Sequence, residues 1–572
     1  MRMSSSLVLV SLVACAGASR STPAPPPARP PPSIATSTTD RALAVQPATP
    51  LDARATAALD GAIASYFETA ATRRVTIVTD KPLYQPGETV WLRVDLRATG
   101  TLLGGPPTGV TASLISPRGA AVIGKRLLVQ RGVGRADLAL PDGLDGGEYR
   151  LQVVADDGTT AARTLVVSTY QAPRLQKTVE FVRKAYGAGD LVQAAIAVAD
   201  AHGAAFASRP LTAVATVDDV EVARLPLTTD GAGHATARFR LPAQLARGDG
   251  LLTVLADDGG VTESIQKRIP IVMATLDLGL YPEGGDLVAG VPGRVYLAAR
   301  TLTGEPADVA GKVVDDRGAV VATFASLRDG LGRFELTPAA DRRYHVALDK
   351  PAGITATFDV PAAAPHGCVV RAVDQRRADR LRVAALCDQP QRVKVVAVLR
   401  ERWLASGGFD VPADAAAVVE LPIDARATGV VRVTLLSADD RPLAERLVFH
   451  GTAAGVTVAI TADRPSYGPR DPVTLTLHAT DADGRPVQTS LALAVVDQTV
   501  LSFADDHQGG LAAQALLGPE LGISPDAPLR DPDAYLAATP DAAAALDALL
   551  ATRGYRRFEW RPILAALPGG TP

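Results

Sequence analysis

Apolar and polar residues alternate along most of this chain, and the stretch from residue 89 to residue 97 shows the pattern most clearly. One face of this stretch carries Val90, Leu92, Val94 and Leu96, and the other carries Trp91, Arg93 and Asp95. A period of two is typical of a half-buried strand in an antiparallel sheet. The preceding residues, T-D-K-P-L-Y-Q-P-G-E at 79–88, contain two prolines and a glycine, so they predict an ordered bend that leads into the strand.

The same arrangement of a tyrosine, turn residues and an alternating strand recurs along the chain. It follows Tyr84, Tyr186 and Tyr467, and a looser copy follows Tyr281. The first copies lie on the order of 100 residues apart, which is the size of one small β-domain. We therefore predict an all-β protein built from tandem two-layer antiparallel β-sandwiches. A tyrosine in this fixed place is more often a packing anchor, with its hydroxyl on a backbone group, than a binding residue.

Three motifs resemble a known family. The sequence D-K-P-L-Y-Q-P-G-E-T-V at 80–90 resembles the opening strand of the macroglobulin domain of alpha-2-macroglobulins and complement components. Y-P-E-G-G-D-L-V-A-G-V-P at 281–292 and L-A-V-V-D-Q-T-V-L at 493–501 resemble later macroglobulin domains, and the second is similar to the strand that precedes the family's bait region. The resemblance runs from about residue 72 onward. It implies immunoglobulin-like macroglobulin domains and an association with endopeptidase inhibition.

The strand rhythm and the resemblance together suggest where the domains begin and end. We expect macroglobulin-like domains at 74–170, 173–272, 273–360, 361–453 and 455–504, the fifth of which is short enough to be incomplete. Residues 51–73 predict a helix, because Leu59, Ile63 and Phe67 recur at helical spacing. We expect this helix to pack against the first domain, and a role in binding a partner is the alternative.

The last 68 positions, 505–572, predict a loop followed by a helical tail. Residues 505–541 are rich in Gly, Pro and Asp and predict a loop. Thr539 and Pro540 then supply an N-cap and an N1 proline for a helix that ends at Gly554.

The N-terminal residues predict a lipoprotein leader. Residues 1–15 contain a basic residue, a short apolar core and L-V-A-C, which resembles the lipobox in which Cys15 becomes diacylated. The alternative is an ordinary signal peptide with an incidental cysteine. Residues 16–50 are rich in Pro, Ala, Ser and Thr and predict a tether. We therefore expect a lipid-anchored protein of the bacterial cell envelope, at the outer membrane on its periplasmic or surface face.

The other two of the chain's three cysteines are expected to form a disulfide. Cys368 and Cys387 flank two short strands and lie symmetrically about a polar turn near 375–379, so a hairpin would place them opposite each other. An oxidising compartment favours the bridge. Two buried free thiols are the alternative.

Composition and motifs argue against several kinds of chemistry. The net charge is only −3 from 58 basic and 61 acidic residues, without a basic aromatic patch, so we expect no nucleic-acid partner. The sequence shows no zinc-ligand spacing and no nucleophile elbow, so we expect no metal, no cofactor, no small-molecule substrate and no enzymatic activity. None of the three cysteines begins the C-x-E-Q sequence of the macroglobulin thioester.

Two functions remain open for this sequence. The first is inhibition of endopeptidases by non-covalent means, in which a protease would cut the loop after residue 501. The candidate protease-exposed residues in that loop are Asp505, Gly509, Gly510, Arg530 and Asp541. The second is a structural or adhesive array of β-sandwiches that binds another envelope protein.

Overall fold

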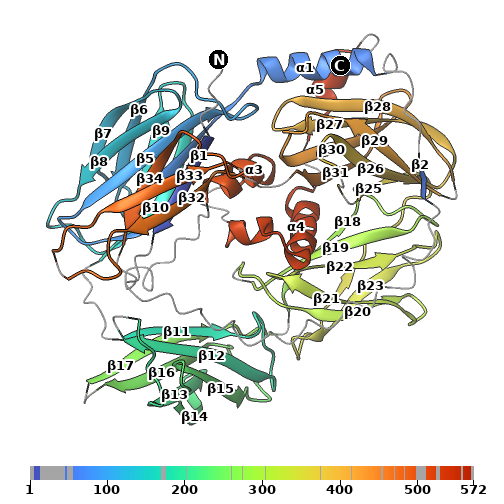
Figure 1. The fold of residues 1–572 in the computed structure, drawn as a ribbon. Coiled ribbons are helices and arrows are strands. Elements are labelled where there is room, and N and C mark those ends of the chain that lie inside the picture. Colours follow the sequence, from blue (N-terminus) through green and yellow to red (C-terminus); the bar gives the residue numbers. More distant parts are fainter. Residues whose placement is uncertain are drawn as a thin grey trace.

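The computed structural model confirms the all-β prediction. It describes residues 6–12, 45–47, 56–168, 175–200, 203–258, 261–273, 275–302, 304–373, 375, 377–413, 415–451, 455–468, 470–481, 483–496, 510–523, 529–555 and 558–567. Antiparallel sheets follow one another along the chain around a ring-like path, and two helices, α3 (Leu511–Leu521) and α4 (Pro540–Arg553), lie in its middle (Figure 1).

The first two sandwiches have the same plan, with a three-stranded sheet packed on a larger one. In the first sandwich the sheets have the orders β3-β5-β8 and β4-β10-β9-β6-β7. Its strands are β3 (Arg73–Thr79), β4 (Leu83–Tyr84), β5 (Thr89–Ala98), β6 (Thr108–Ile115), β7 (Ala121–Val129), β8 (Val133–Ala139), β9 (Gly147–Ala155) and β10 (Thr160–Val167).

The second sandwich has sheets of order β11-β12-β15 and β14-β13-β16-β17. Its strands are β11 (Leu175–Phe181), β12 (Leu191–Asp200), β13 (Pro210–Val217), β14 (Val220–Thr228), β15 (His234–Arg240), β16 (Gly250–Asp258) and β17 (Val261–Ile269). Each of these two sandwiches encloses its own apolar core, because alternate residues of every strand face inward.

The third sandwich is a single hydrogen-bonded sheet folded around one core. Its order is β18-β19-β22-β21-β20-β23-β24, and β21 pairs with both halves. Its strands are β18 (Asp277–Pro282), β19 (Gly293–Arg300), β20 (Ala310–Asp315), β21 (Val320–Arg328), β22 (Leu331–Leu336), β23 (Tyr344–Lys350) and β24 (Thr357–Asp359).

The fourth sandwich has sheets of order β2-β29-β26-β25 and β28-β27-β30-β31. Its strands are β2 (Val45–Pro47), β25 (Cys368–Ala372), β26 (Arg380–Cys387), β27 (Gln391–Leu399), β28 (Trp403–Val411), β29 (Ala416–Pro422), β30 (Gly429–Ser437) and β31 (Pro442–His450). Cys368 and Cys387 are directly paired across β25 and β26 and form the predicted disulfide, with their Cα atoms 4.1 Å apart.

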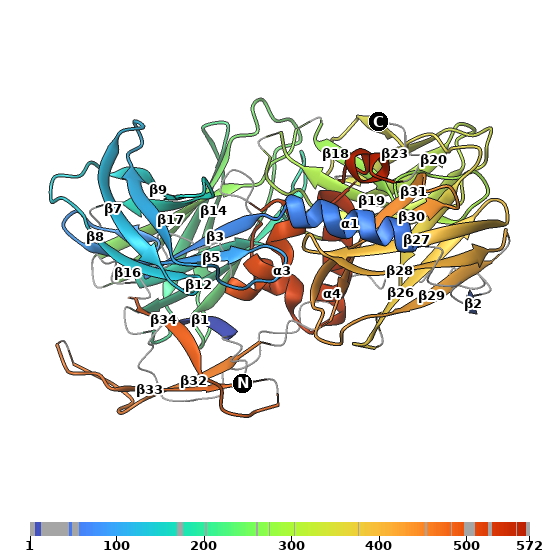
Figure 2. The same cartoon turned by 90° about the horizontal axis from the view of Figure 1, so that it is seen from above.

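The strands that follow form a smaller fifth unit. β32 (Thr457–Ala462) pairs with β33 (Leu475–Thr480), and β34 (Thr489–Val495) pairs in parallel with β1 (Ser6–Leu12). Seen from above, β32 and β33 project from the rest of the molecule (Figure 2).

The predicted N-terminal helix forms, but its predicted partner is wrong. α1 (Ala57–Thr69) buries Leu59, Ile63 and Phe67, as its spacing requires. These side chains pack on the fourth sandwich and on α5 (Arg561–Ala565), not on the first domain. Asp60 adds polar contacts there, since it accepts hydrogen bonds from Trp403 Nε1 at 3.0 Å and from the Ser406 hydroxyl at 2.8 Å.

The recurring tyrosines act as the predicted anchors of the turns. In each turn the backbone N–H three residues earlier donates to the hydroxyl, at 3.3 Å for Tyr84, 3.0 Å for Tyr186 and 3.1 Å for Tyr467. Each hydroxyl also donates a hydrogen bond: to Gln193 O from Tyr186, and to an aspartate four residues earlier from Tyr84 and Tyr467.

Candidate functional site

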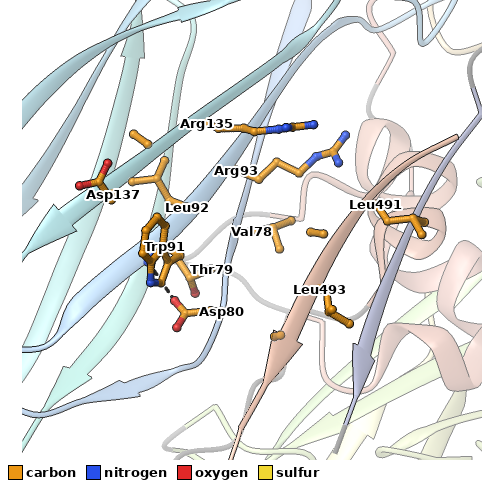
Figure 3. A pocket seen from close by; sticks show the side chains of 13 residues that line it. Val78, Thr79, Asp80, Trp91, Leu92, Arg93, Arg135, Asp137, Leu491 and Leu493 are labelled. Carbon is orange, nitrogen blue, oxygen red and sulfur yellow. Dashed lines mark hydrogen bonds between the residues drawn. The ribbon is translucent and has the colours of Figure 1, made fainter. Parts of the chain in front are cut away.

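A cleft of about 330 Å³ lies between the outer face of the first sandwich and β34 (Figure 3). β3, β5 and β8 form one wall, and Leu491 and Leu493 of β34 form the other. Trp91 is 61% exposed and Leu493 is 43% exposed, so large apolar groups line a space that solvent can enter. A cleft of this size, with apolar walls and a few polar groups, suits a peptide segment or a small ligand.

The wall formed by β34 is fixed by arginines of the first sandwich. Arg93 Nη1 lies 3.3 Å from Ser490 Oγ and 3.4 Å from Ser490 O, and Arg135 Nη2 lies 3.4 Å from Ser490 Oγ. Arg93 is in turn held by Asp95, with Nε 2.7 Å from Oδ2. Arg93 and Asp95 are therefore buried, although alternation along the strand puts them on the polar face. The reason is that β34 covers this face, which residues 89–97 cannot reveal.

Two carboxylates complete the polar part of the cleft. Asp80 accepts hydrogen bonds from the Tyr84 hydroxyl at 2.6 Å and from the backbone N–H of Trp91 at 3.0 Å. Burial, and then the neighbouring Asp80, raise the pKa of Tyr84, so its hydroxyl stays protonated and remains a donor. On the other side, a hydrogen bond from Lys125 lowers the pKa of Asp137. The cleft thus presents charges of both signs beside apolar walls.

The predicted protease-exposed loop is partly helical, which corrects the expectation of a loop over 505–541. Helix α3 occupies 511–521 and the 3-10 helix η2 (Pro532–Leu536) follows. α3 forms because Ala513, Leu517 and Leu521 can be buried on one side, against the fourth sandwich. The apolar spacing of these three residues was the signal that the Gly and Pro content obscured.

The individual candidates in this segment lie in different surroundings. Asp505 and Gly509 lie outside the described residues. The Gly510 N–H donates to Asp533 Oδ2 at 2.6 Å, and Arg530, which is exposed, pairs with Glu305 of the third sandwich at 2.7 Å. Asp541 is exposed in the first turn of α4, whose predicted cap is confirmed because Thr539 Oγ1 accepts from the Ala542 N–H at 3.2 Å. These residues are not brought together into one site.

The helical tail, defined as α3, η2, α4 and α5, is attached to the sandwiches by ion pairs and hydrogen bonds as well as by apolar packing. Glu520 of α3 pairs with the buried Arg432 at 2.6 Å. The Tyr535 hydroxyl of η2 donates to Asp329 Oδ2 at 3.0 Å, and Asp329 also pairs with Lys184 of the second sandwich. The tail therefore contacts the third and fourth sandwiches, and Asp329 links η2 indirectly to Lys184 of the second sandwich.

Asp329 makes this attachment sensitive to acid. Burial by itself would raise the pKa of Asp329, but the hydrogen bond and charge of Lys184, together with Tyr535 and Arg328, lower it overall from its usual 3.8. A carboxylate with a lowered folded-state pKa stabilises the fold above its unfolded pKa, and this contribution is lost as the pH falls through the folded value. We expect η2 to stay attached down to about pH 4 and to detach only below it. Hydrogen exchange of the amides of 533–536 between about pH 6 and pH 3, corrected for intrinsic rates, measures this.

Asp329→Asn is the control for this prediction, because it should remove the acid-dependent step. An exchange rate that already rises between about pH 6 and pH 5 would contradict the role of Asp329.

Helix α4 inserts one carboxylate into a buried charge cluster between the third and fourth sandwiches. The members of this charge cluster are Glu283, Arg294, Tyr296, Arg371, Arg446 and Asp547. Asp547 is the member that α4 contributes. Arg446 Nη2 lies 2.6 Å from Asp547 Oδ1, Arg446 Nε lies 3.4 Å from Glu283 Oε1, and the Tyr296 hydroxyl donates to Asp547 Oδ2 at 2.7 Å. Burial alone would lower the pKa of Arg446, but Tyr296, Asp547 and Glu283 raise it overall, so Arg446 stays charged.

The charge cluster is a structural junction and not a binding pocket. The space beside Glu283 and Arg446 amounts to about 10 Å³, which is at the lower limit for a single water molecule. Glu283 belongs to the Y-P-E-G-G-D motif, and Asp547 is the one charged residue between Asp541 and Arg553 in the Ala- and Leu-rich helix α4. Neither residue was predicted to have a role, and a charge in the middle of an otherwise apolar stretch of α4 was the available signal.

Other expected features can be located only in part. Cys15, the expected lipidation residue, lies outside the described residues. Within the described part of the chain, no three His, Cys, Asp or Glu side chains gather as metal ligands. The described helices are also too short or too polar to cross a membrane.

No protein-family model and no curated protein sequence matches this chain. Among solved structures it is similar to trypsin-activated alpha-2-macroglobulin from Escherichia coli, with a TM-score of 0.42 and 14% identity over 72% of this chain and 33% of that one. It is also similar to Salmonella alpha-2-macroglobulin reacted with methylamine, with a TM-score of 0.32 and 14% identity over 72% of this chain and 32% of that one. The E. coli adhesin FdeC matches with a TM-score of 0.17 and 16% identity over 51% of this chain and 97% of that one. The chain thus spans about a third of the length of the alpha-2-macroglobulins it matches.

Proposed function

We propose that this chain is a macroglobulin-like protein of the bacterial envelope that engages endopeptidases non-covalently through the segment between β34 and α4. The observation that carries the proposal is the way this one segment links two fixed points. At its start, Ser490 of β34 is held by Arg93 and Arg135. At its end, Asp547 of α4 is held in the charge cluster. A cut between these points would free the two ends from each other.

The segment offers one cleavage site of clear specificity. Arg530 is the one Lys or Arg residue in 505–541, and it is exposed. Its pair with Glu305 is on the surface and contributes at most about 1 kcal/mol, so it would not prevent a protease from binding the bond after Arg530. A trypsin-like protease would therefore cut this segment once, between α3 and η2.

Covalent capture is not part of the proposal. The sequence has no C-x-E-Q stretch, and Cys368 and Cys387 are joined to each other. Retention of a protease would depend on surfaces that separate or close when the segment is cut. Lipidation of Cys15 would hold the chain at the membrane, which fractionation of a Cys15→Ser variant would test.

The test is trypsin treatment of three proteins followed by size-exclusion chromatography. The unchanged chain should be cut after Arg530 and should elute with trypsin retained. Arg530→Gln should be resistant at this site and retain no trypsin. Glu305→Gln is the matched control, because it breaks the same ion pair but leaves the cleavage site, and it should behave like the unchanged chain.

Two results would contradict the proposal. One is cleavage after Arg530 without retention of trypsin, and the other is equal retention by Arg530→Gln. Trypsin with a blocked active site should not be retained by any of the three proteins, because it cannot cut the segment.

A second function, a β-sandwich array that binds another envelope protein, is favoured by the solvent-accessible cleft beside Trp91 and Leu493. The array would not require cleavage. Retention of trypsin by the unchanged chain but not by Arg530→Gln would favour protease engagement over the array.

A further inference from the structure

The outer face of the first sandwich carries a tryptophan that the fold does not require. Trp91 is 61% exposed and comes seven residues after the anchoring tyrosine of its turn. At the same offset from Tyr186 and Tyr467 come Gln193 and Thr474, and in both of these copies the turn forms beside a polar residue. The indole of Trp91 is therefore available to contact a ligand.

Two carboxylates flank Trp91, one on each neighbouring strand. Asp137 of β8 lies directly opposite Trp91 in the register of β5 and β8, so the two side chains share one face of the sheet. On the other side, the Asp80 N–H donates to the Trp91 carbonyl at 3.2 Å, which places Asp80 beside Trp91 just beyond the end of β3. An acidic row of Asp80, Trp91 and Asp137 thus crosses the three strands.

The contacts of these two carboxylates leave part of each one open to a ligand. The Tyr84 hydroxyl and the backbone N–H of Trp91 both donate to Asp80 Oδ1, and Lys125 donates to Asp137 Oδ1 at 2.7 Å. No described residue donates in this way to Oδ2 of either carboxylate. The side chains of Lys125 and Asp137 are 44% and 48% exposed, so theirs is a weak surface ion pair that another cation can replace.

The opposite wall of the cleft is apolar. Leu491 and Leu493 of β34 face the acidic row across the space of about 330 Å³ (Figure 3). A Lys or Arg side chain matches both walls, because it combines an apolar stem with a cationic head group. The stem would contact the leucines, and the head group would lie over an indole, which is the aromatic ring that attracts cations most strongly.

We propose that this cleft binds a Lys or Arg side chain in an extended segment of a partner protein, with the cationic group over Trp91 and between Asp80 and Asp137. Cation–π attraction and two carboxylates of opposite charge act on the same group. The inference rests on the second proposed function, binding of another envelope protein, and names the type of residue that the array would recognise.

The neighbouring row of outward-facing residues adds a second feature. Arg93 lies opposite Arg135, two residues along the strands from Trp91 and Asp137. Arg93 is neutralised by the buried Asp95, whereas Arg135 is exposed. A segment that runs along β5 presents every second side chain to the same face, so a carboxylate two residues from the bound cation would meet Arg135. The preferred segment therefore carries Asp or Glu at that place.

The experiment uses the full chain and labelled peptides that share one host sequence of alternating Ser and Val, with Arg, Lys, Leu or Glu at the central position. Fluorescence anisotropy measures the affinities. We expect the Arg and Lys peptides to bind at least about tenfold more tightly than the Leu peptide, and the Glu peptide to bind most weakly. Added salt should reduce this difference, because it screens exposed charges. Glu placed two residues from the Arg should strengthen binding, and Lys placed there should weaken it.

Protein variants test the location and the charges. Trp91→Leu should remove most of the preference for Arg, because leucine keeps the apolar contact but not the cation–π attraction. Asp137→Asn should weaken binding of the Arg peptide several-fold. Asp410→Asn is its matched control, since it breaks a similar surface ion pair with Arg392, at 2.9 Å on the fourth sandwich, and should leave binding unchanged. Lys125→Met should strengthen binding, because Lys125 competes for Asp137.

The possible failures can be told apart. Equal binding of the Arg, Leu and Glu peptides that is lost in Trp91→Leu would overturn the preference for a cation but leave the array function standing. Absence of binding by every peptide would overturn both. Unchanged binding to Trp91→Leu would place the peptide elsewhere and overturn the proposal. A dimer of the chain that the Arg peptide does not dissociate, and that Trp91→Leu does, would overturn it in favour of a second copy.

Discussion

Glu283→Gln is expected to lower the free energy of unfolding of the third and fourth sandwiches by about 3–5 kcal/mol. Glu283 is fully buried and faces three guanidinium groups, those of Arg294, Arg371 and Arg446, at 3.9, 3.4 and 3.4 Å. Glutamine keeps the shape but removes the charge, so the three arginines would lose the buried carboxylate that they share. The effect is measured as a shift in the midpoint of a urea transition that is monitored through hydrogen exchange in β19 and β31.

Glu335→Gln is the matched control for the Glu283 variant. Glu335 pairs with Arg294 at 3.2 Å and with Arg371 at 3.5 Å, but its side chain is 23% exposed, so water can replace the lost charge. We expect its cost to stay near or below about 1 kcal/mol. Equal losses of stability in the two variants would mean that burial does not determine how much each carboxylate contributes to the charge cluster.

Leu549→Ala is expected to lower the free energy that holds the helical tail on the sandwiches by about 2–5 kcal/mol. Leu549 is 3% exposed and packs in the core that α3 and α4 share with the third and fourth sandwiches. Its removal leaves a cavity that the two rigid sheets cannot close. Because the tail packs on the third and fourth sandwiches, its release should increase the rate of trypsin cleavage after Arg530, which gel electrophoresis over time measures.

Ala543→Ser on the exposed side of α4 controls for changes in helix propensity, and it should cost less than about 1 kcal/mol. The prediction would fail if Leu549→Ala left both the cleavage rate and the thermal transition of the third and fourth sandwiches unchanged.

Local patterns predicted the elements that depend on neighbouring residues. The alternation at 89–97 predicted β5, and the tyrosine turns formed with their hydroxyls on nearby backbone groups. Thr539 and Pro540 predicted the start of α4, and the symmetric spacing of Cys368 and Cys387 about a turn predicted the disulfide. In each case a residue interacts with groups close to it along the chain or directly across a hairpin.

The errors concern contacts between residues far apart in the sequence. α1 was expected on the first domain but packs on the fourth sandwich, much later in the chain, because its apolar stripe fits Val396, Val398 and Leu436 there. A stripe of Leu, Ile and Phe shows that a helix needs an apolar partner, but apolar contact is non-directional and does not specify which partner. Helix α3 was missed for a related reason, since its burial against the fourth sandwich outweighs the Gly and Pro content of its surroundings.

The sequence by itself determined the repeated strand and turn, the disulfide pair and the start of α4, because each depends on local hydrogen bonds and on side-chain periodicity. Only the tertiary structure decided which surfaces meet. It buried Arg93 and Asp95 beneath β34, placed Glu283 and Asp547 on either side of Arg446, and left Val473 and Leu477 exposed. The physical reason is that burial and charge compensation depend on the positions of all the sandwiches, and identical local patterns can therefore be closed in one place and exposed in another.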